Sequence, residues 1–338
     1  MGAPTWIDVL EATYDVDAGE EQWLQGIARA SDRVLDAGFG IFAFVYDASV
    51  PERMTIERFV RTRETLFDAQ RALAGIEAAG GGRYVRHTFR TLKAGAVRST
   101  PEFAGSEAER MLDADGVGDF VVINGLDPSG IGMCVGTITA RRARLSRPQR
   151  LRYERIAAHL ANGYRLRRRL ASPITRKQRA PWGADAVLST RGSLEHCGAD
   201  DVYRARGQLR AGTAAIERAR GRSRRIPLDS ALADWLGLVD GRWSLVDKFD
   251  SDGKRYVLAR RNEPRVAGLG LLTERERAIA AYAALGHDNK LIAYELGIAH
   301  STVRVLIARA AKRLGVKTRD GLVEAVRAAS VAAPGRPR

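Results

Sequence analysis

The sequence Leu272-Thr-Glu-Arg-Glu-Arg-Ala278 opens the stretch that decides how the C-terminal part of this chain folds. Thr273 is followed three residues later by Glu276, which is the spacing of a capping box, so a helix is predicted to begin at Thr273. That helix is predicted to end at Gly286, because glycine favours the backbone conformation that closes a helix. The stretch continues Gly286-His-Asp-Asn-Lys-Leu-Ile-Ala-Tyr-Glu-Leu-Gly-Ile298.

Two further helices are predicted to follow directly. Asp288 is a suitable N-cap for the second, and Gly297 turns the chain before a third helix opens at His300 or Ser301. With Val303 at the centre of the buried face, helical geometry places beside it Ile307, Ala310 and Leu314. The outer face is then small, polar and basic and consists of Ser301, Val305, Ala308, Arg309 and Lys312. This is the pattern of a helix-turn-helix, whose second helix enters the major groove of DNA.

The same stretch resembles the LuxR-type helix-turn-helix domain of bacterial transcription regulators. The matching elements are Leu272-Thr273-x-Arg275-Glu276, Gly286-x-x-Asn289-Lys290-x-Ile292-Ala293, Thr302-Val303-Arg304-Val305 and Leu314-x-Val316-x-x-Arg319. The chain departs from the family at Ala299, where Ser is usual, and at Leu306, where His is usual. The resemblance implies an all-α four-helix domain over residues 268–330 that binds double-stranded DNA.

The resemblance also implies roles for individual residues. Base reading is expected from Arg304, Val305, Ala308 and Arg309, with Arg304 paired to guanine and Val305 against a thymine methyl group. Contacts to the DNA backbone are expected from Asn289, Lys290, Ser301, Thr302 and Lys312. A homodimer on DNA is expected because one short helix reads few bases. Its predicted pairing surface is formed by Leu322, Val323 and Val326.

Composition limits what the rest of the chain can be. Its 338 residues suffice for two or three domains, and no apolar run approaches the ~20 residues of a membrane span. The acidic N-terminal segment is unlike a signal peptide, so a cytoplasmic location without membrane attachment is expected. The net charge of +15 favours a polyanionic partner. Cys134 and Cys197 have neither metal-ligand nor disulfide spacing, and both are predicted to be buried thiols.

An α+β pattern covers residues 1–170. Helical spacing up to Gly38 precedes the apolar run Ile41–Tyr46, which is predicted to be a buried strand. A helix is predicted from Ser146 to about Leu170, since Ser146 is a capping residue. The other predicted elements are a helix over 56–76, an extended segment over 83–92 and a β-hairpin with strands at 120–124 and 131–138. This order resembles a GAF-type sensor domain, with a ligand pocket expected between the sheet and its covering helices and lined by 42–46 and 121–134.

A second α+β module is predicted after a basic, proline-containing linker over 171–182. It covers residues 183–263 and resembles a PAS-type module. Its predicted elements are strands at 186–188 and 194–196, helices at 200–219 and 228–236, and a hairpin around Asp252-Gly253. The fold class is therefore multidomain: an α+β sensor region, GAF-like then PAS-like, followed by the helix-turn-helix domain and a disordered tail over 331–338. The Arg-rich end of the Ser146 helix, Arg165 with Arg167–Arg169, is interpreted as solvated, dimer-facing or linker-adjacent in preference to a second DNA contact.

Catalysis is not indicated. His87, His159 and His196 have no partner at catalytic or ligand spacing, and 80–83 lacks the spacing of a phosphate loop, so neither enzyme activity, a cofactor nor a metal is predicted. The leading hypothesis is a sequence-specific DNA-binding transcriptional regulator whose N-terminal region senses a small-molecule or protein signal. The alternative is a protein-interaction scaffold with a helix-turn-helix domain of reduced DNA specificity, which Ala308 and Leu306 favour.

Overall fold

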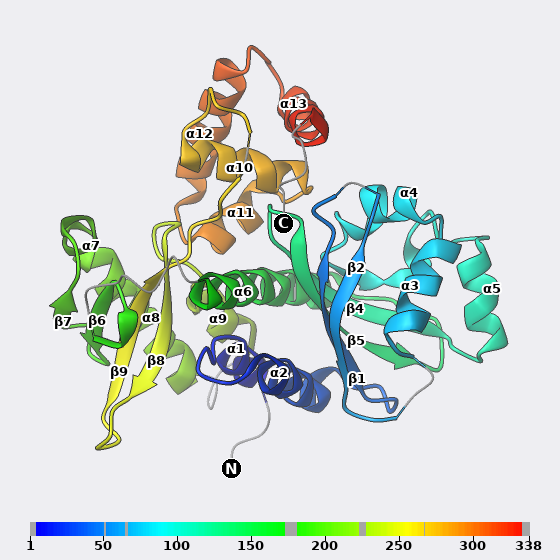
Figure 1. The fold of residues 1–338 in the computed structure, drawn as a ribbon, viewed down its shortest axis with the longest axis horizontal. Coiled ribbons are helices and arrows are strands. Elements are labelled where there is room, and N and C mark those ends of the chain that lie inside the picture. The colour runs from blue at the N-terminus through cyan, green and yellow to red at the C-terminus, as the bar shows by residue number, and fades with distance from the viewer. Residues whose placement is uncertain are drawn as a thin grey trace.

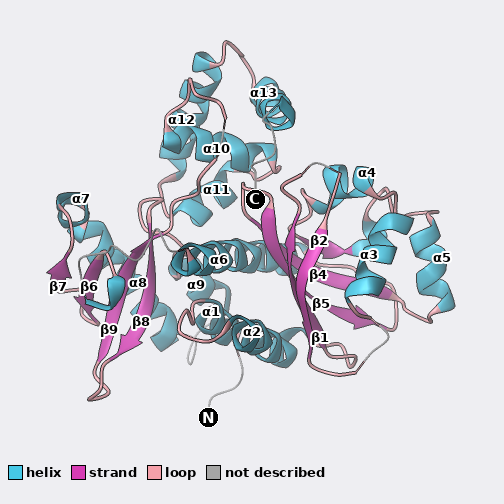
Figure 2. Cartoon of the chain, in the orientation of Figure 1, coloured by secondary structure: helices cyan, strands magenta, loops and turns pink. Residues whose placement is uncertain are grey.

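The computed structural model describes residues 5–50, 52–64, 67–172, 181–222, 228–266 and 268–332. The chain forms an N-terminal α+β region with two antiparallel sheets, followed by a helical C-terminal domain (Figure 1). The two sheets stand on opposite sides of a central group of helices, and the C-terminal helices lie across one end of that group (Figure 2). The predicted fold class is confirmed at this level, while the GAF-like and PAS-like assignments and the exact domain boundaries stay predictions.

The first sheet has five strands, and all neighbouring strands are antiparallel. Their order is β2 (Thr55–Arg61), β1 (Ile41–Asp47), β5 (Ile131–Thr139), β4 (Asp119–Leu126) and β3 (Ala94–Ala96). β4 and β5 form the predicted hairpin, and β1 is the predicted buried strand. Nearly every residue of β1, β4 and β5 is buried, because both faces of the sheet are covered.

Helices cover the two faces of this sheet (Figure 1). One face carries α1 (Trp6–Thr13), α2 (Glu20–Leu35) and α6 (Arg147–Ala171). The other carries α3 (Ala69–Ala78), α4 (Gly82–Tyr84), a π-helix (Val85–Phe89), a 3-10 helix (Val97–Ser99) and α5 (Glu107–Ala114). Alternate strand residues divide between the two layers, as pleating requires: Val45 packs toward α6 and Phe44 toward α3. At Gly125 a Cβ atom would lie 2.6 Å from the carbonyl oxygen of Ala157, so glycine lets α6 approach the sheet closely.

The helix predicted over 56–76 is wrong in its first half. Residues Thr55–Arg61 form the edge strand β2, which pairs with β1. Ile56, Phe59 and Val60 also suit an edge strand, and pairing with β1 outweighs their approximate helical spacing. The second half is helical but begins only at α3, where the Asp68 side chain accepts a hydrogen bond from the backbone N–H of Arg71.

The extended segment predicted over 83–92 is also wrong. It is helical from Gly82 to Phe89, first as α4 and then as the π-helix. Tyr84, Val85, Thr88 and Phe89 are buried on one side, which is a helical and not an alternating spacing. The glycines before this segment favoured a loop interpretation, and the short helical spacing went unrecognised.

The second sheet has four antiparallel strands in the order β7 (Leu194–Cys197), β6 (Ala186–Ser189), β9 (Arg255–Arg261) and β8 (Trp243–Phe249). Its helices are α7 (Asp200–Arg204), α8 (Arg206–Arg222) and α9 (Leu228–Asp234), and a 3-10 turn (Pro181–Gly183) precedes β6. These elements agree with the predicted ones within a few residues. Buried residues of this module and of α1, α2 and α6 belong to one apolar cluster, so the two modules share a core.

Three smaller predictions have mixed outcomes. Of the predicted linker, residues 173–180 lie outside the described part, and Ala171 still belongs to α6. Of the predicted tail, residues 333–338 lie outside the described part, whereas Val331 and Ala332 belong to the last helix. Cys134 is buried as predicted, but Cys197 is exposed because β7 is an edge strand with little covering it.

The C-terminal domain consists of α10 (Glu274–Ala284), α11 (Asn289–Leu296), α12 (His300–Arg313) and α13 (Arg319–Ala332). Each predicted start agrees with the structure, including the alternative of His300 for α12. Within the described residues no single helix is long and apolar enough to cross a membrane, although α11 and α12 pass that test as a pair bent by 109°, by length and composition only.

Candidate nucleic-acid interface and signal cavity

Local hydrogen bonds build the helix-turn-helix as the sequence predicted. The backbone N–H of Thr273 donates to Oε2 of Glu276 over 2.9 Å, which completes the capping box of α10. The backbone N–H of Leu291 donates to Oδ1 of Asp288 over 2.7 Å and so caps α11. Gly297 then adopts a left-handed conformation with φ of 59°, which turns the chain toward α12.

The outer face of α12 is open to solvent. Val303 and Ala310, on its opposite side, are fully buried. The exposed side chains belong to Ser301, Arg304, Val305, Ala308, Arg309 and Lys312. All four residues predicted to read bases therefore lie on one accessible face, and Val305 leaves 49% of its surface exposed. An apolar side chain exposed between cations suits a groove that offers both thymine methyl groups and hydrogen-bond acceptors.

The two departures from the LuxR pattern have different consequences. Ala299 occupies the N-cap position of α12 and provides no side-chain hydrogen bond, so the first backbone N–H groups of that helix remain open to an outside acceptor. Leu306 is half-buried and packs against the apolar cluster that includes Val303. Leucine at this position therefore contributes to packing and not to the exposed face.

The residues predicted to contact the DNA backbone differ in their exposure and in their hydrogen bonds within the chain. Lys290 is exposed and Thr302 is half-buried. Asn289 is half-buried, and its Oδ1 accepts a hydrogen bond from Nη1 of Arg319. Arg319 also donates to the carbonyl oxygen of His287, so it ties α13 to the start of α11. A surface hollow at this point is lined by, among others, Lys290, His300, Arg319 and Arg327.

Sequence reasoning missed His300 and Arg327 as members of this group. The spacing of Arg319 and Arg327, eight residues apart on α13, places both on one side of the helix and was the available signal. The hollow is open and lies beside the first turn of α11, and its basic side chains outnumber its two carboxylates, Asp288 and Asp320. Such a surface can hold a phosphate group through charge and backbone N–H donors together.

The residues predicted to form a pairing surface lie mainly inside the domain. Leu322 and Val326 are 0% and 3% exposed and pack in a cluster with Leu272 and Ala280. Val323 is half-buried. The side chains of Leu322 and Val326 therefore hold α13 on the rest of the domain, because their spacing of four residues faces α10 rather than solvent.

Residues 270–328 match the family model described as "Bacterial regulatory proteins, luxR family". These residues form a LuxR-family domain. The match covers α10, α11 and α12 completely and most of α13. It agrees with the resemblance inferred from the motifs at Leu272-Thr273 and Thr302–Val305.

Comparison with curated proteins gave no match to the chain. Among solved structures, the crystal structure of Escherichia coli SdiA has a TM-score of 0.22 at 10% identity and covers 95% of this chain and 92% of that one. SdiA in complex with octanoyl-rac-glycerol has a TM-score of 0.21 at 10% identity and covers 95% of this chain and 88% of that one. The proposals below rest on the LuxR-family match and on the contacts within this chain.

A buried polar network joins the LuxR domain to the N-terminal region. Arg165 of α6 is its centre, so the interpretation of this arginine as part of a solvated face is wrong. Its Nη1 donates to Oδ2 of Asp127 over 2.5 Å and to the hydroxyl of Tyr282 in α10 over 3.2 Å. Its Nε donates to the carbonyl oxygen of Asn262 over 2.9 Å. One side chain thus connects the first sheet, the second module and the LuxR domain.

Tyr294 of α11 makes a second buried connection. Its hydroxyl donates to the carbonyl oxygen of Leu232 over 2.7 Å and therefore accepts from Nε2 of His159, also 2.7 Å away. Nδ1 of His159 is then the acceptor for the hydroxyl of Tyr14 at 3.1 Å. Burial lowers the pKa of His159 to about 3, so the ring is neutral and fixed in one tautomer.

The turn between α11 and α12 also packs against the second module. The backbone N–H of Gly241 donates to the carbonyl oxygen of Leu296 over 2.6 Å. A Cβ atom at Gly297 would lie 1.8 Å from the carbonyl oxygen of Leu238. Glycine at this position therefore serves both the turn of the helix-turn-helix and the close contact with the loop before β8.

A cavity of about 330 Å³ lies on the α3 and α5 side of the first sheet. Aromatic side chains dominate its walls, and the ring centroids of Phe42 and Phe120 lie 4.6 Å from that of Phe67 in both cases. The remaining walls include Phe44, Tyr84, Phe89, Leu92, Phe103, Met111, Leu112, Val122, Cys134 and Ile138. Its position agrees with the pocket expected between the sheet and its covering helices. The charged residues that line it, Glu64, Arg71 and Asp115, are at least partly exposed.

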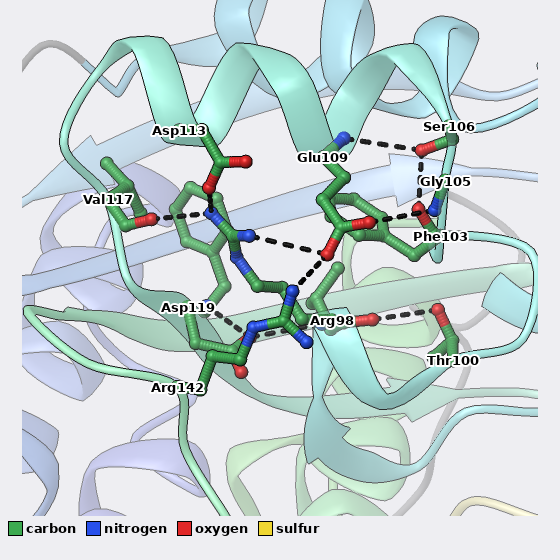
Figure 3. Close-up of polar contacts among 12 residues, drawn as sticks. Arg98, Thr100, Phe103, Gly105, Ser106, Glu109, Asp113, Val117, Asp119 and Arg142 are labelled. Carbon is green, nitrogen blue, oxygen red and sulfur yellow. Dashed lines mark hydrogen bonds and ion pairs between the residues drawn. The ribbon is translucent and has the colours of Figure 1, made fainter.

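Two sets of ion pairs hold α5 over this cavity. Nε of Arg71 on α3 donates to Oδ2 of Asp115 over 3.1 Å. On the other side, buried Arg98 donates through Nη2 to Oδ1 of Asp113 over 2.7 Å and to the carbonyl oxygen of Val117 over 2.8 Å (Figure 3). Glu109 lies between Arg98 and Arg142 and pairs with both (Figure 3). The helix that closes the cavity is therefore fixed by charge at its outer edge as well as by its apolar side.

Proposed function

We propose that this protein is a sequence-specific DNA-binding transcriptional regulator. The observation that carries the proposal is an exposed basic face on α12 inside a domain that matches the LuxR family. Three cations lie on that face: Arg304, Arg309 and Lys312. Such cations are attracted to DNA phosphates, and an arginine in the major groove can pair with guanine through two hydrogen bonds.

In this proposal the face of α12 divides between base and backbone contacts. Arg304, Val305, Ala308 and Arg309 read base edges. Asn289, Lys290, Ser301, Thr302 and Lys312 contact the backbone. The hollow lined by Arg319 and Arg327 adds cations on the backbone side, which supports a phosphate contact at the first turn of α11.

The regulator acts on DNA as a homodimer in this proposal, because paired half-sites double the number of bases that one short helix reads. We assign the pairing surface to α13. Leu322 and Val326 already pack inside the domain, so the surface uses Val323 together with the exposed side of the helix, which carries Glu324 and Ala328. Light scattering of the protein on an isolated site tests this. Two chains per site are expected, and one chain per site would rule the dimer out.

The signal in this proposal is an apolar small molecule that binds in the cavity beside α5. An aromatic wall with charged groups confined to the more exposed side supports an apolar ligand with at most a few polar atoms. A thermal-shift panel of apolar small molecules, applied to the intact chain and to Gly75→Leu, tests this assignment. A leucine there narrows the cavity, so molecules that stabilise the intact chain are expected to lose their effect on the variant.

Selection of genomic fragments at about physiological salt tests the DNA-binding role. Enrichment of particular fragments over competitor DNA is expected. The scaffold alternative predicts no preferred fragment. Its support from Leu306 is weaker than the sequence suggested, because packing alone accounts for a leucine at this half-buried position.

A further inference from the structure

One segment of the N-terminal region touches both the cavity and the LuxR domain. Residues 85–93 begin with the π-helix Val85–Phe89, in which the backbone N–H of Arg90 donates to the carbonyl oxygen of Val85, five residues earlier. Phe89 and Leu92 line the cavity. Lys93, the next residue, reaches away from the cavity into the LuxR domain. The π-helix is a rare geometry that occurs frequently at functional sites.

Asn124 on β4 fixes this segment from the sheet side. Its Nδ2 donates to the carbonyl oxygens of Phe89 and Leu92 over 2.9 and 2.8 Å. Its backbone N–H donates to the carbonyl oxygen of Lys93 over 2.6 Å. The Tyr46 hydroxyl donates to Oδ1 of Asn124 over 2.6 Å. Because Asn124 is 2% exposed and uses both ends of its amide, it ties Phe89, Leu92 and Lys93 to one point on β4.

Lys93 connects this segment to α10. Its Nζ donates to the carbonyl oxygen of Leu285, the C-cap residue of α10, over 2.9 Å, and to that of Thr91 over the same distance. A cation at this position meets the negative end of the α10 dipole and satisfies a carbonyl that the helix leaves unpaired. Lys93 is half-buried between the two parts, and this burial lowers its pKa to about 8.

The apolar packing is continuous along the same route. Phe89 and the cavity residues Phe44 and Cys134 belong to one buried cluster with Leu285 and Tyr282 of α10. The cavity wall and the LuxR domain are therefore linked by packed apolar side chains, through which a displacement of Phe89 can be passed on.

We infer that segment 85–93 transmits the state of the cavity to the LuxR domain, with Lys93 as the residue that passes displacement to the end of α10. The inference rests on the proposed sensing function. When a molecule fills the cavity, it presses on Phe89 and Leu92, and the segment carries Lys93 with it. The contact with Leu285 then strengthens or weakens, which changes how firmly α10 is held against the N-terminal region.

Hydrogen–deuterium exchange on the intact chain tests this without any ligand. Gly75 on α3 lines the cavity, and a Cβ atom there has no atom within 4 Å, so Gly75→Leu adds a side chain at the cavity wall. In the otherwise unchanged chain, Gly75→Leu is expected to alter exchange both in residues 85–93 and in residues 281–287, by about fivefold or more. In the Lys93→Met background the change in 85–93 is expected to persist, and the change in 281–287 to disappear.

A matched control is Lys248→Met on β8 of the second module. It removes an ammonium group that lies 2.8 Å from the carboxylate of Asp17. In that background both changes are expected to persist. Cys134→Met, which presses on the cavity from β5, serves as a second filling variant. The inference is overturned if 281–287 responds equally with and without Lys93, or if neither filling variant affects 281–287. The thermal-shift panel on the unchanged chain fails or succeeds independently of these exchange measurements, so a failure of the proposed sensing function is distinguished from a failure of this inference.

Discussion

Nη1 of Arg165, in the middle of the N-terminal region, lies 3.2 Å from the hydroxyl of Tyr282 in the first helix of the LuxR domain. The same nitrogen pairs with Asp127, and all three residues are buried. The LuxR domain is thus joined to the N-terminal region by a buried charge. Separation of the two parts would expose this ion pair and several polar groups at once. These contacts are therefore expected to form and break together.

Arg165→Met is expected to lower the free energy of unfolding by about 3–5 kcal/mol, because it leaves the Asp127 carboxylate buried without its partner. Urea unfolding measures the change. Arg58→Met is the control, since Arg58 pairs with Glu20 and Glu21 at a side-chain exposure of 40%, and exposed pairs contribute about 0–1 kcal/mol. Equal losses for the two variants would show that the Arg165 pair contributes no more than a surface pair.

Tyr294→Phe keeps the ring and removes the hydroxyl that links His159 to Leu232. A buried N–H and a buried carbonyl then lose their partner, so a loss of about 1–3 kcal/mol is expected in chemical unfolding. Tyr203→Phe, at a residue that is 54% exposed, is expected to change stability by less than about 0.5 kcal/mol. A Tyr294 variant as stable as the unchanged protein contradicts the hydrogen-bonding assignment at His159.

Glu295 is expected to make the stability of the folded chain depend on pH. It is 1% exposed, its Oε2 lies 2.8 Å from Nδ1 of His287, and burial raises its pKa well above the usual range. The unfolded chain releases this proton near pH 4.3, whereas the folded chain retains it to higher pH, so stability falls as pH rises through that window.

Glu295→Gln removes this titration and keeps a polar side chain of the same shape. As pH rises from 5 to 8, the variant is expected to become more stable relative to the unchanged protein. Each unit by which folding raises the pKa of Glu295 corresponds to about 1.4 kcal/mol of unfolding free energy. Urea unfolding at the two pH values measures the difference. Glu324→Gln, at an exposed position on α13, provides the control. A Glu295 effect that is identical at both pH values would mean that the carboxyl is ionised throughout.

Local signals were enough to predict the elements that position the exposed face of α12. The side chains of Thr273 and Asp288 cap their helices with nearby backbone groups, and such contacts follow from residue spacing alone. The hairpin of β4 and β5 followed from two apolar runs around a turn. The prediction for 83–92 failed because its helical spacing is short and follows a run of glycines that favours a loop. The prediction for 55–61 failed because pairing with β1 decided its conformation.

The role of Arg165 was beyond sequence reasoning for a different reason. Three of its partners, Asp127, Asn262 and Tyr282, are 38, 97 and 117 residues away. Its one nearby partner, Asn162, is a polar residue whose spacing does not by itself indicate burial. An arginine followed by three more arginines favours a solvated face unless the fold is known. The same holds for Lys93, whose partner Leu285 lies 192 residues further along.

The central claim, that the exposed face of α12 reads DNA sequence, is tested most directly by comparing Arg304→Ala with Lys290→Ala. Both residues are exposed, but only Arg304 is assigned to a base edge. Titrations on the selected site and on random DNA, at one salt concentration, give the preference for each protein. Arg304→Ala is expected to reduce the preference by about 1–3 kcal/mol, whereas Lys290→Ala weakens binding to both DNAs alike. Equal losses on both DNAs for both variants would contradict the claim.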